Sequence, residues 1–170
     1  MQLIDPNANT RSVRLGRWIL GIIQHWNPTK YWRRREYVVN PSRGGGGIVR
    51  KFVYLTWIKW IDAHHNCSFG TNINAGASFS SPPLLPHGPN GIIVGHSVSV
   101  GKNVRIYQQV TIAAGASIGD NCILGAGAKV LEGRHVGNNV KVGANCVVIE
   151  DIPDGSTVVL SKPRIISNNS

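Results

Sequence analysis

Histidine and cysteine side chains are among the candidates for proton transfer or metal binding in this chain. The 170 residues include six histidines and three cysteines. An imidazole with an ordinary pKa of about 6.5 takes up and releases protons at neutral pH. His87 lies in residues 81–91, a segment with four prolines and two glycines. Irregular segments of this kind often carry function, so His87 is the first candidate for acid–base chemistry.

The three cysteines predict neither a metal site nor a disulfide framework. No two of them have the C-x-x-C spacing of a metal-binding pair, and their number is odd. Cys122 and Cys146 fall in a regular series of small and apolar residues, and Cys67 falls on the same phase upstream. We expect three buried, reduced thiols that pack as small hydrophobic side chains, and no bound metal.

The element that must position these residues is a repeat of six residues between Val94 and Ile152. Ten aliphatic anchors follow one another in register, and six of them precede a glycine. A second series, four residues after each anchor, is small or apolar at nine of ten positions. A period of six fits neither a helix nor a flat strand, and it is typical of a parallel β-helix. The anchors are Val94, Val100, Ile106, Ile112, Ile118, Leu124, Val130, Val136, Val142 and Val148.

In such a fold three sextets close one triangular coil of about eighteen residues. The anchors point into the prism and stack from coil to coil, and a glycine after the anchor avoids a clash of its Cβ at the corner. Arg134 occupies a position of the second, inward series. We therefore expect a local bulge or an outward loop at Arg134.

Upstream of Val94 the register is disturbed. Phe69-Gly70 and Ala75-Gly76 continue the anchor–glycine pattern, with Phe79 in the second series. His87 falls on the anchor phase of these sextets, but the next anchor, Val94, follows seven residues later instead of six. The pattern predicts one extra residue immediately after His87, and an irregularity in a regular solenoid favours a functional site.

Residues 1–66 form a separate, basic, helical segment. They hold eleven Lys and Arg against three acidic residues, whereas residues 67–170 hold seven against five. Helices are expected at 11–25, 31–39 and 48–63, the first ended by Asn27-Pro28. The buried side of the last helix is predicted to hold Ile48, Val49, Phe52, Val53, Leu55, Trp57, Trp60 and Ile61.

These helices are expected to pack on the first coil and cap it, because an open end of a β-helix exposes unpaired strand edges. Peripheral docking of the basic helices on a membrane is the alternative. Binding of nucleic acid is not expected, because no recognition motif is present. No membrane-spanning stretch or signal peptide is found, which favours a cytoplasmic protein.

Several segments resemble the active-site coils of serine O-acetyltransferases and related hexapeptide acyltransferases. They are Leu85-Pro86-His87-Gly88, Gly91–Gly95, Asn103–Ile112 and the ending Asp151–Val159. The resemblance covers about residues 67–166 and implies a mainly β fold, a left-handed parallel β-helix of hexapeptide repeats behind a short N-terminal helical segment. Residues 167–170 are then a tail.

The resemblance implies acetyl transfer from acetyl-CoA to a hydroxyl group. His87 matches the family's catalytic histidine and would act as the general base. Asn72 stands fifteen residues earlier, where the family has a carboxylate that orients the histidine. The backbone amides of Ala113 and Ala114 align with a Gly-Gly pair and would stabilise the oxyanion.

The remaining site residues follow from the same resemblance and from the coil spacing. Tyr107, Gln108 and Gln109 lie one coil after His87 and, with His96, are the expected substrate-binding residues. The family binds coenzyme A between neighbouring subunits of a trimer, and a homotrimer is expected here. The residues expected to bind coenzyme A are Ala113, Ala114, Gly125, Ala126, Lys129, Lys162 and Arg164.

The acceptor is predicted from departures from the family pattern. Asn72 cannot offset an imidazolium charge, and the loop with an Arg-His pair that holds the serine carboxylate is absent. The segment Pro82–His87 and the ending Val159–Ile166 look like a subgroup associated with capsule and exopolysaccharide synthesis. These features favour a hydroxyl of a sugar or polysaccharide precursor, with serine as the alternative.

One other class remains as an alternative, and a second is not expected. A degenerate acyltransferase kept as a scaffold or membrane-associated protein is compatible with Asn72 and the missing loop. A β-helical carbonic anhydrase would need three histidines for zinc, but His25, His64, His65, His87, His96 and His135 include no pair with that family's H-x4-H spacing.

Overall fold

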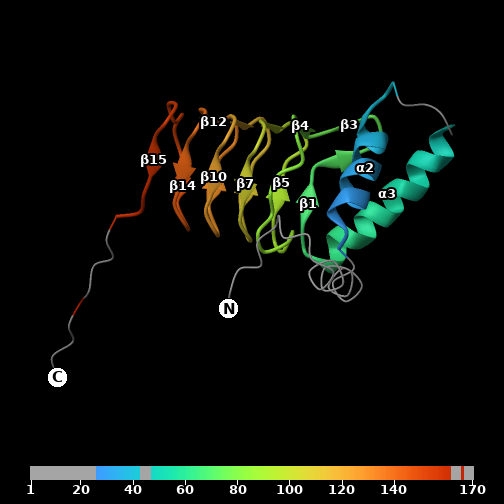
Figure 1. Ribbon diagram of the computed structural model, residues 1–170, viewed down its shortest axis with the longest axis horizontal. Helices are drawn as coiled ribbons and strands as arrows, with labels where there is room; N and C mark the ends of the chain where they lie inside the picture. The colour runs from blue at the N-terminus through green and yellow to red at the C-terminus, as the bar shows by residue number, and fades with distance from the viewer. Residues whose placement is uncertain (1–25, 43–46, 162–165, 167–170) are drawn as a thin grey trace, which may run out of the picture.

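The protein is a stack of triangular coils with two helices across one end (Figure 1). The computed structural model describes residues 26–42, 47–161 and 166, so the helix predicted at 11–25 lies outside the described residues. Helix α2 spans Pro28–Val39 and helix α3 spans Gly47–His64. Both predicted helices in the described part are therefore present, each slightly longer than expected.

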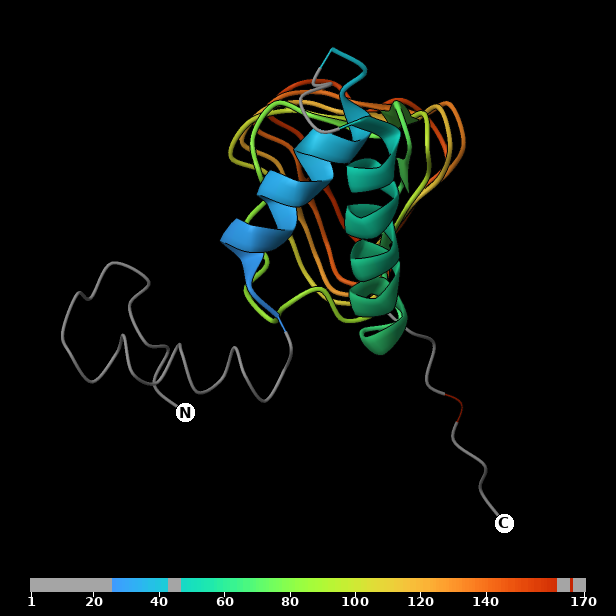
Figure 2. The same cartoon turned by 90° about the vertical axis from the view of Figure 1, so that its right-hand side faces the viewer.

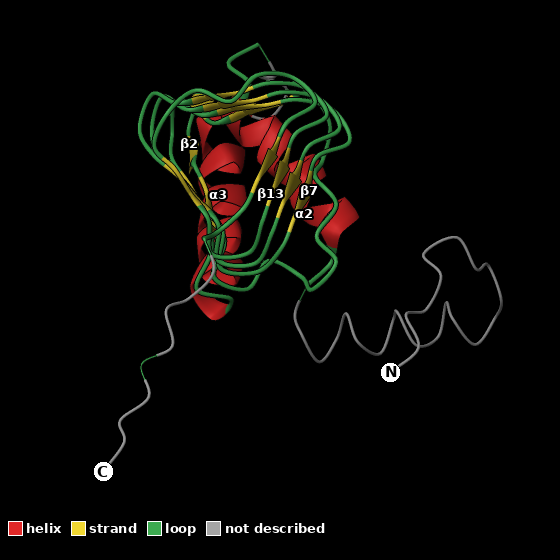
Figure 3. Ribbon diagram, turned by 90° about the vertical axis from the view of Figure 1, so that its left-hand side faces the viewer, coloured by secondary structure: helices red, strands yellow, loops and turns green. Residues whose placement is uncertain are grey.

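The strands are two residues long and form three parallel sheets, one on each face of the prism (Figure 3). The sheet orders are β1-β5-β8-β11-β14, β15-β13-β10-β7 and β12-β9-β6-β4, and β2-β3 is a separate antiparallel pair. The strands are β1 (Ser68–Phe69), β2 (Thr71–Asn72), β3 (Ala75–Gly76), β4 (Ser78–Phe79), β5 (Ile93–Val94), β6 (Ser99–Val100), β7 (Arg105–Ile106), β8 (Thr111–Ile112), β9 (Ser117–Ile118), β10 (Ile123–Leu124), β11 (Lys129–Val130), β12 (His135–Val136), β13 (Lys141–Val142), β14 (Val147–Val148) and β15 (Thr157–Val158).

The predicted period of six is confirmed by the pairing of the strands. Val94 pairs with Ile112, which lies three sextets on, and Val130 pairs with Val148 in the same way. The ten anchors are at most 3 % exposed. The glycines after the anchors leave room for the next coil, because a Cβ on Gly119 would lie 2.7 Å from the backbone of Gly137. The repeat therefore forms the continuous core that the sequence predicts.

The first coil differs from the prediction. Phe79 pairs with Val100 and is therefore an anchor, not a member of the second series. Ala75-Gly76, which was expected to continue the anchor–glycine pattern, instead pairs with Thr71-Asn72 in the β2-β3 hairpin. Leu84 bridges to Arg105, so three extra residues lie between Leu85 and Val94, and His87 is in this loop and not on an anchor position.

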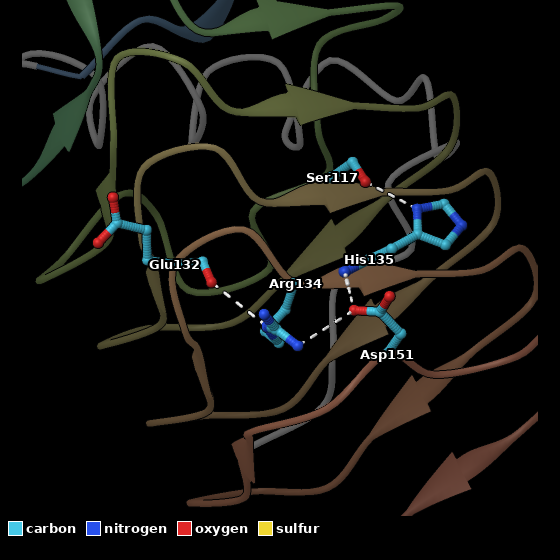
Figure 4. A network of polar contacts seen from close by, with 5 residues as sticks. All are labelled: Ser117, Glu132, Arg134, His135 and Asp151. Atoms are coloured by element: carbon cyan, nitrogen blue, oxygen red, sulfur yellow. Dashed lines mark hydrogen bonds and ion pairs between the residues drawn. The ribbon is translucent and has the colours of Figure 1, made fainter.

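Neither the local bulge nor the outward loop predicted at Arg134 is present (Figure 4). Strand β12 stays in register, with His135 paired to Ser117. The Arg134 side chain turns outward, where its Nη1 lies 3.7 Å from Asp151 Oδ1. The same carboxylate oxygen accepts a hydrogen bond of 2.9 Å from the backbone N–H of His135. The coil accommodates an arginine because the side chain leaves the prism without changing the backbone.

Helix α2 begins where the sequence analysis placed a helix end. Pro28 is in its first turn, and the Asn27 side chain accepts a hydrogen bond of 2.9 Å from the backbone N–H of Lys30. Asparagine before proline is a favourable helix start, because the amide oxygen satisfies a free N–H and proline lacks one. The dipeptide Asn27-Pro28 therefore opens α2.

Arg35 of α2 caps the first coil, which agrees with the expected role of the helices. Both helices lie across the end of the stack, and α2 packs on β2 and β3 (Figure 2). The buried Arg35 Nη2 donates to the carbonyl oxygens of Phe69 at 2.8 Å and Ala77 at 2.6 Å. Burial lowers the pKa of Arg35 to about 10, so it stays charged at neutral pH. Phe69 and Ala77 belong to the first coil, so no preceding coil donates N–H groups to their carbonyl oxygens. The guanidinium of Arg35 donates to them instead.

The outer side of α3 is more exposed than predicted. Of the eight side chains expected to be buried, Ile61 is buried and Leu55 and Trp57 are partly buried. The other five are more than half exposed: Ile48, Val49, Phe52, Val53 and Trp60. Helix α3 is thus apolar on faces that nothing in the described part covers.

The three cysteines are buried and unpaired, as expected. Burial raises the pKa of Cys67, which lies beside the Asp62 carboxyl, and also raises that of Cys122. Neither α2 nor α3 is long and apolar enough to cross a bilayer.

Candidate active site

The loop that carries His87 lies at one corner of the prism. His87 is exposed, and its ring packs edge-on against Tyr107, with the ring centroids 5.5 Å apart and the planes at 83°. The side-chain amide of Asn90 donates a hydrogen bond of 3.0 Å to the carbonyl oxygen of His87. The Tyr107 ring and the hydrogen bond from Asn90 therefore hold the His87 segment at the surface of the corner. The imidazole stays exposed, so a substrate can reach it.

Asn90 also ties this loop to the end of α3. Its Oδ1 lies 3.1 Å from Nδ1 of the buried His65, and the N–H of Gly91 donates to the His65 carbonyl oxygen at 3.0 Å. Sequence reasoning missed both His65 and Asn90. His65 is 22 residues before His87 with no recognisable spacing, and only the packing of α3 on the first coil brings them near.

A cavity of about 310 Å³ opens beside the loop. Two predicted substrate-binding residues, Gln108 and Gln109, are among the residues that line it. Gln109 has a φ of +61°, in the left-handed region that favours glycine and asparagine. The equivalent corners of the next two coils use Gly127 and Asn145. A glutamine held in this conformation beside a cavity points to function, because strained backbone concentrates at such sites.

A different corner holds other predicted residues. Asn72 Nδ2 lies 3.5 Å from His96 Nδ1, and no hydrogen bond joins Asn72 to His87. Gly95 stacks on Ala113 and Ala114, since a Cβ on Gly95 would lie 2.8 Å from the Ala114 nitrogen. The structure thus brings Asn72 and His96 together, with Ala113 and Ala114 at the same corner, and separates them from His87 within one chain.

The two alanines differ in what their amides offer. The N–H of Ala113 donates a hydrogen bond of 2.9 Å to Val130 in the sheet. Ala114 is exposed. Of the two backbone amides expected to stabilise an oxyanion, the one of Ala113 is therefore already used by the ladder.

The structure describes some of the residues expected to bind coenzyme A. Gly125 and Ala126 lie at the His87 corner one coil below Tyr107 and Gln108, and Gly127 donates to the Gln108 carbonyl oxygen at 3.0 Å. Lys129 is exposed on β11. Lys162 and Arg164 lie outside the described residues.

A second, larger cavity of about 620 Å³ lies between α2 and the chain before Leu84, lined among others by Trp32, Phe79 and Pro83. None of the predicted site residues lines it. Among residues 26–42, 47–161 and 166, no group of three His, Cys, Asp or Glu side chains is placed to hold a metal ion.

Comparison with protein families identifies the repeat. Residues 115–150 match the model of the bacterial transferase hexapeptide (six repeats), and residues 88–131 match that of the hexapeptide repeat of succinyl-transferase. The chain therefore carries hexapeptide repeats of the bacterial transferase type, in a left-handed β-helix. A search of curated protein sequences finds no significant match.

Solved serine acetyltransferases share the fold. Isoform 3 from Entamoeba histolytica, in complex with cysteine, is 25 % identical over 97 % of this chain and 56 % of its own, with a TM-score of 0.61. The enzyme from Neisseria gonorrhoeae is 27 % identical over 71 % of this chain and 48 % of its own, with a TM-score of 0.55. A serine acetyltransferase in complex with CoA is 22 % identical over 90 % and 59 %, with a TM-score of 0.51. This chain spans little more than half the length of the first of them.

Proposed function

We propose that this chain is an acetyl-CoA-dependent O-acetyltransferase that acetylates a hydroxyl of a sugar or polysaccharide precursor, with His87 as the general base. The observation that carries the proposal is the placement of His87. It is exposed in a loop that interrupts a transferase-type hexapeptide repeat, with its ring against Tyr107 and a polar cavity next to the loop. The likeness to a serine acetyltransferase solved with CoA supports the choice of donor.

The chemistry needs a base that works at neutral pH. His87 takes the proton of the acceptor hydroxyl as its oxygen attacks the acetyl thioester, and returns the proton to the departing thiolate. An N–H donor is needed for the negative charge on the former carbonyl oxygen, and Ala114 offers one. Gly125 and Ala126 lie beside the His87 corner, and Lys129, Lys162 and Arg164 supply positive charge for the phosphates of coenzyme A.

A homotrimer would unite the two separated corners. Within one chain His87 lies at one corner, and Asn72, His96 and Ala114 lie at another. In a ring of three identical chains, the first corner of one protomer faces a different corner of the next. We infer that the complete site lies between protomers, with Asn72 and Ala114 contributed by a neighbour.

The test is release of thiol from acetyl-CoA by the purified protein, with nucleotide sugars, free sugars and L-serine as acceptors. A sugar is expected to be acetylated, and His87→Ala is expected to lower kcat by about 10²- to 10⁴-fold. The control is His135→Ala, an exposed histidine at another part of the coil that should leave the rate unchanged. Turnover of serine alone would favour serine O-acetyltransferase. Binding of neither acetyl-CoA nor any acceptor would favour an inactive scaffold.

We further propose that α3 rests on an anionic membrane surface, where a lipid-linked acceptor would be found. Its exposed face is apolar, and Arg50 and Lys59 lie on the same helix. Residues 1–66 carry a net charge of +8 from eleven basic and three acidic residues. An exposed apolar face bordered by cations is the pattern of an interfacial helix.

Sedimentation with vesicles of neutral and of anionic lipid tests this surface. The full chain is expected to bind only the anionic vesicles, and Phe52→Ser with Trp60→Ser should weaken binding about tenfold or more. Leu160→Ser, an equally exposed leucine at the opposite end of the stack, is the control. Binding that is absent, or that does not fall with added salt, would contradict the proposal.

A further inference from the structure

The cavity of about 310 Å³ beside the His87 loop has an unusual polar lining that the chemistry at His87 does not use. It lies where the end of α3 meets the His87 corner. Its volume is near the lower end of about 300–1,000 Å³ that is usual for ligand pockets, which suits a monosaccharide-sized group. The lining residues are His64, His65, Asn66, Asn90, Gly91, Gln108 and Gln109.

The hydrogen bonds around Asn90 determine which atom of His65 is available. Asn90 uses its NH₂ group for the His87 carbonyl oxygen, so its Oδ1 faces His65 Nδ1 at 3.1 Å. Nδ1 of a neutral imidazole must then carry the proton, and Nε2 is an acceptor. His65 is 9 % exposed, and its Nε2 has no hydrogen-bond partner.

Gln108 provides a second acceptor of the same kind. Its Oε1 is buried and has no hydrogen-bond partner. Buried acceptors without donors are unfavourable, and both of these atoms belong to residues that line the same cavity, which points to a donor from outside the chain. The lining contains no Lys or Arg, the side chains that proteins use to bind carboxylates and phosphates. The cavity therefore favours a neutral ligand with several hydroxyl groups.

We propose that this cavity binds the non-reacting hydroxyl groups of the acceptor sugar, which donate to His65 Nε2 and Gln108 Oε1. The inference rests on the proposed function, because it makes the cavity the acceptor side of the His87 site. Asn90 links the two, since the same side chain contacts His65 in the cavity and the backbone of His87. His65 and Gln108 then decide acceptor specificity, and His87 performs the proton transfer.

Direct binding separates this inference from the chemistry. The probes are the methyl glycosides of glucose, galactose and N-acetylglucosamine, and L-serine, each measured by saturation-transfer NMR with the full chain. His65→Asn keeps a donor for Asn90 and removes the Nε2 acceptor, and Gln108→Leu removes the second acceptor while keeping the shape. Each is expected to weaken glycoside binding about fivefold, as loss of one hydrogen bond to a neutral group would. His135→Asn is the matched control, and coenzyme A binding reports the folded state of every variant.

Binding of at least one glycoside that both cavity variants weaken and His135→Asn leaves unchanged would support the inference. If such a glycoside binds but is not acetylated, the proposed acetyl transfer fails, and the cavity is a sugar-binding site that does not serve the chemistry at His87. Binding of L-serine alone, of no probe, or of a glycoside equally well by all variants would overturn it.

Discussion

Gln109 shows what a single residue contributes to the candidate site. It adopts a φ of +61° where the coils below use Gly127 and Asn145. A side chain other than glycine costs about 1–2 kcal/mol in this conformation. That cost is tolerated only where the side chain serves a purpose, and Gln109 lines the cavity beside His87.

Gln109→Gly is therefore expected to raise the free energy of unfolding by about 1 kcal/mol and to raise the KM for the acceptor. Denaturant unfolding and acceptor titration measure the two effects. Asn145→Gly is the matched control, because Asn145 has a φ of +57° on the same corner two coils away. A less stable Gln109→Gly, or an unchanged KM, would contradict a role for Gln109 in the site.

At the scale of elements, α2 and α3 are joined by a buried polar contact. The Tyr31 hydroxyl donates a hydrogen bond of 2.6 Å to Asp62 Oδ1, and Asp62 Oδ2 has no partner. Burial raises the pKa of Asp62. A carboxyl whose pKa is raised by folding stabilises the fold most below its unfolded pKa of about 3.9, and this contribution is lost as the pH rises through the folded value.

Tyr31→Phe removes the donor that offsets the carboxylate charge, so the pKa of Asp62 should rise further. The variant is expected to lose about 1–3 kcal/mol of unfolding free energy at pH 7.5 and less at pH 4.5, because protonation of Asp62 is increasingly favoured as the pH falls. Urea unfolding at both pH values measures this difference. Tyr54→Phe, on a partly buried tyrosine of α3 whose hydroxyl accepts hydrogen bonds from the exposed Arg50, should change stability by less than about 0.5 kcal/mol. An equal loss at both pH values would show that Asp62 does not change its protonation between them, which would contradict this prediction.

At the scale of the whole molecule, the stack separates residues that the resemblance expects in one site. His87 and Tyr107 occupy one corner, and Asn72 and His96 occupy another. Two corners of a rigid prism cannot approach each other, because the buried sheets between them are continuous from coil to coil. The site proposed above would therefore be completed only by a second copy of the chain.

Mixing two inactive variants tests this assembly. In a trimer formed from equal amounts of His87→Ala and the double variant Asn72→Ala with His96→Ala, about a quarter of the interfaces join two intact corners. After the two variants are unfolded and refolded together, their mixture is expected to regain about a quarter of the wild-type rate. Each variant refolded alone should stay inactive. No recovery, from variants that do form mixed trimers, would place the whole site within one chain.

The first coil explains why sequence reasoning misplaced His87. The hairpin adds four residues between Phe69 and Phe79, and the His87 loop adds three between Leu85 and Val94. Together the two insertions add seven residues, which is one more than a sextet. Counting in steps of six from Phe69 to Val94 therefore gives one sextet too many and one residue in excess. A count at a period of six cannot distinguish two insertions that together add seven residues from one additional sextet and one extra residue.

The sequence by itself determined the β-helix from Val94 to Val148, since every aliphatic anchor at that period must be buried and only stacked coils bury all of them. It also singled out the irregular segment around His87. Only the tertiary structure decided which residues share a corner, because the three extra residues after Leu85 and the packing of α3 bring His65, Asn90 and Gln108 to one cavity. Such contacts join residues far apart in the chain, and no local spacing encodes them.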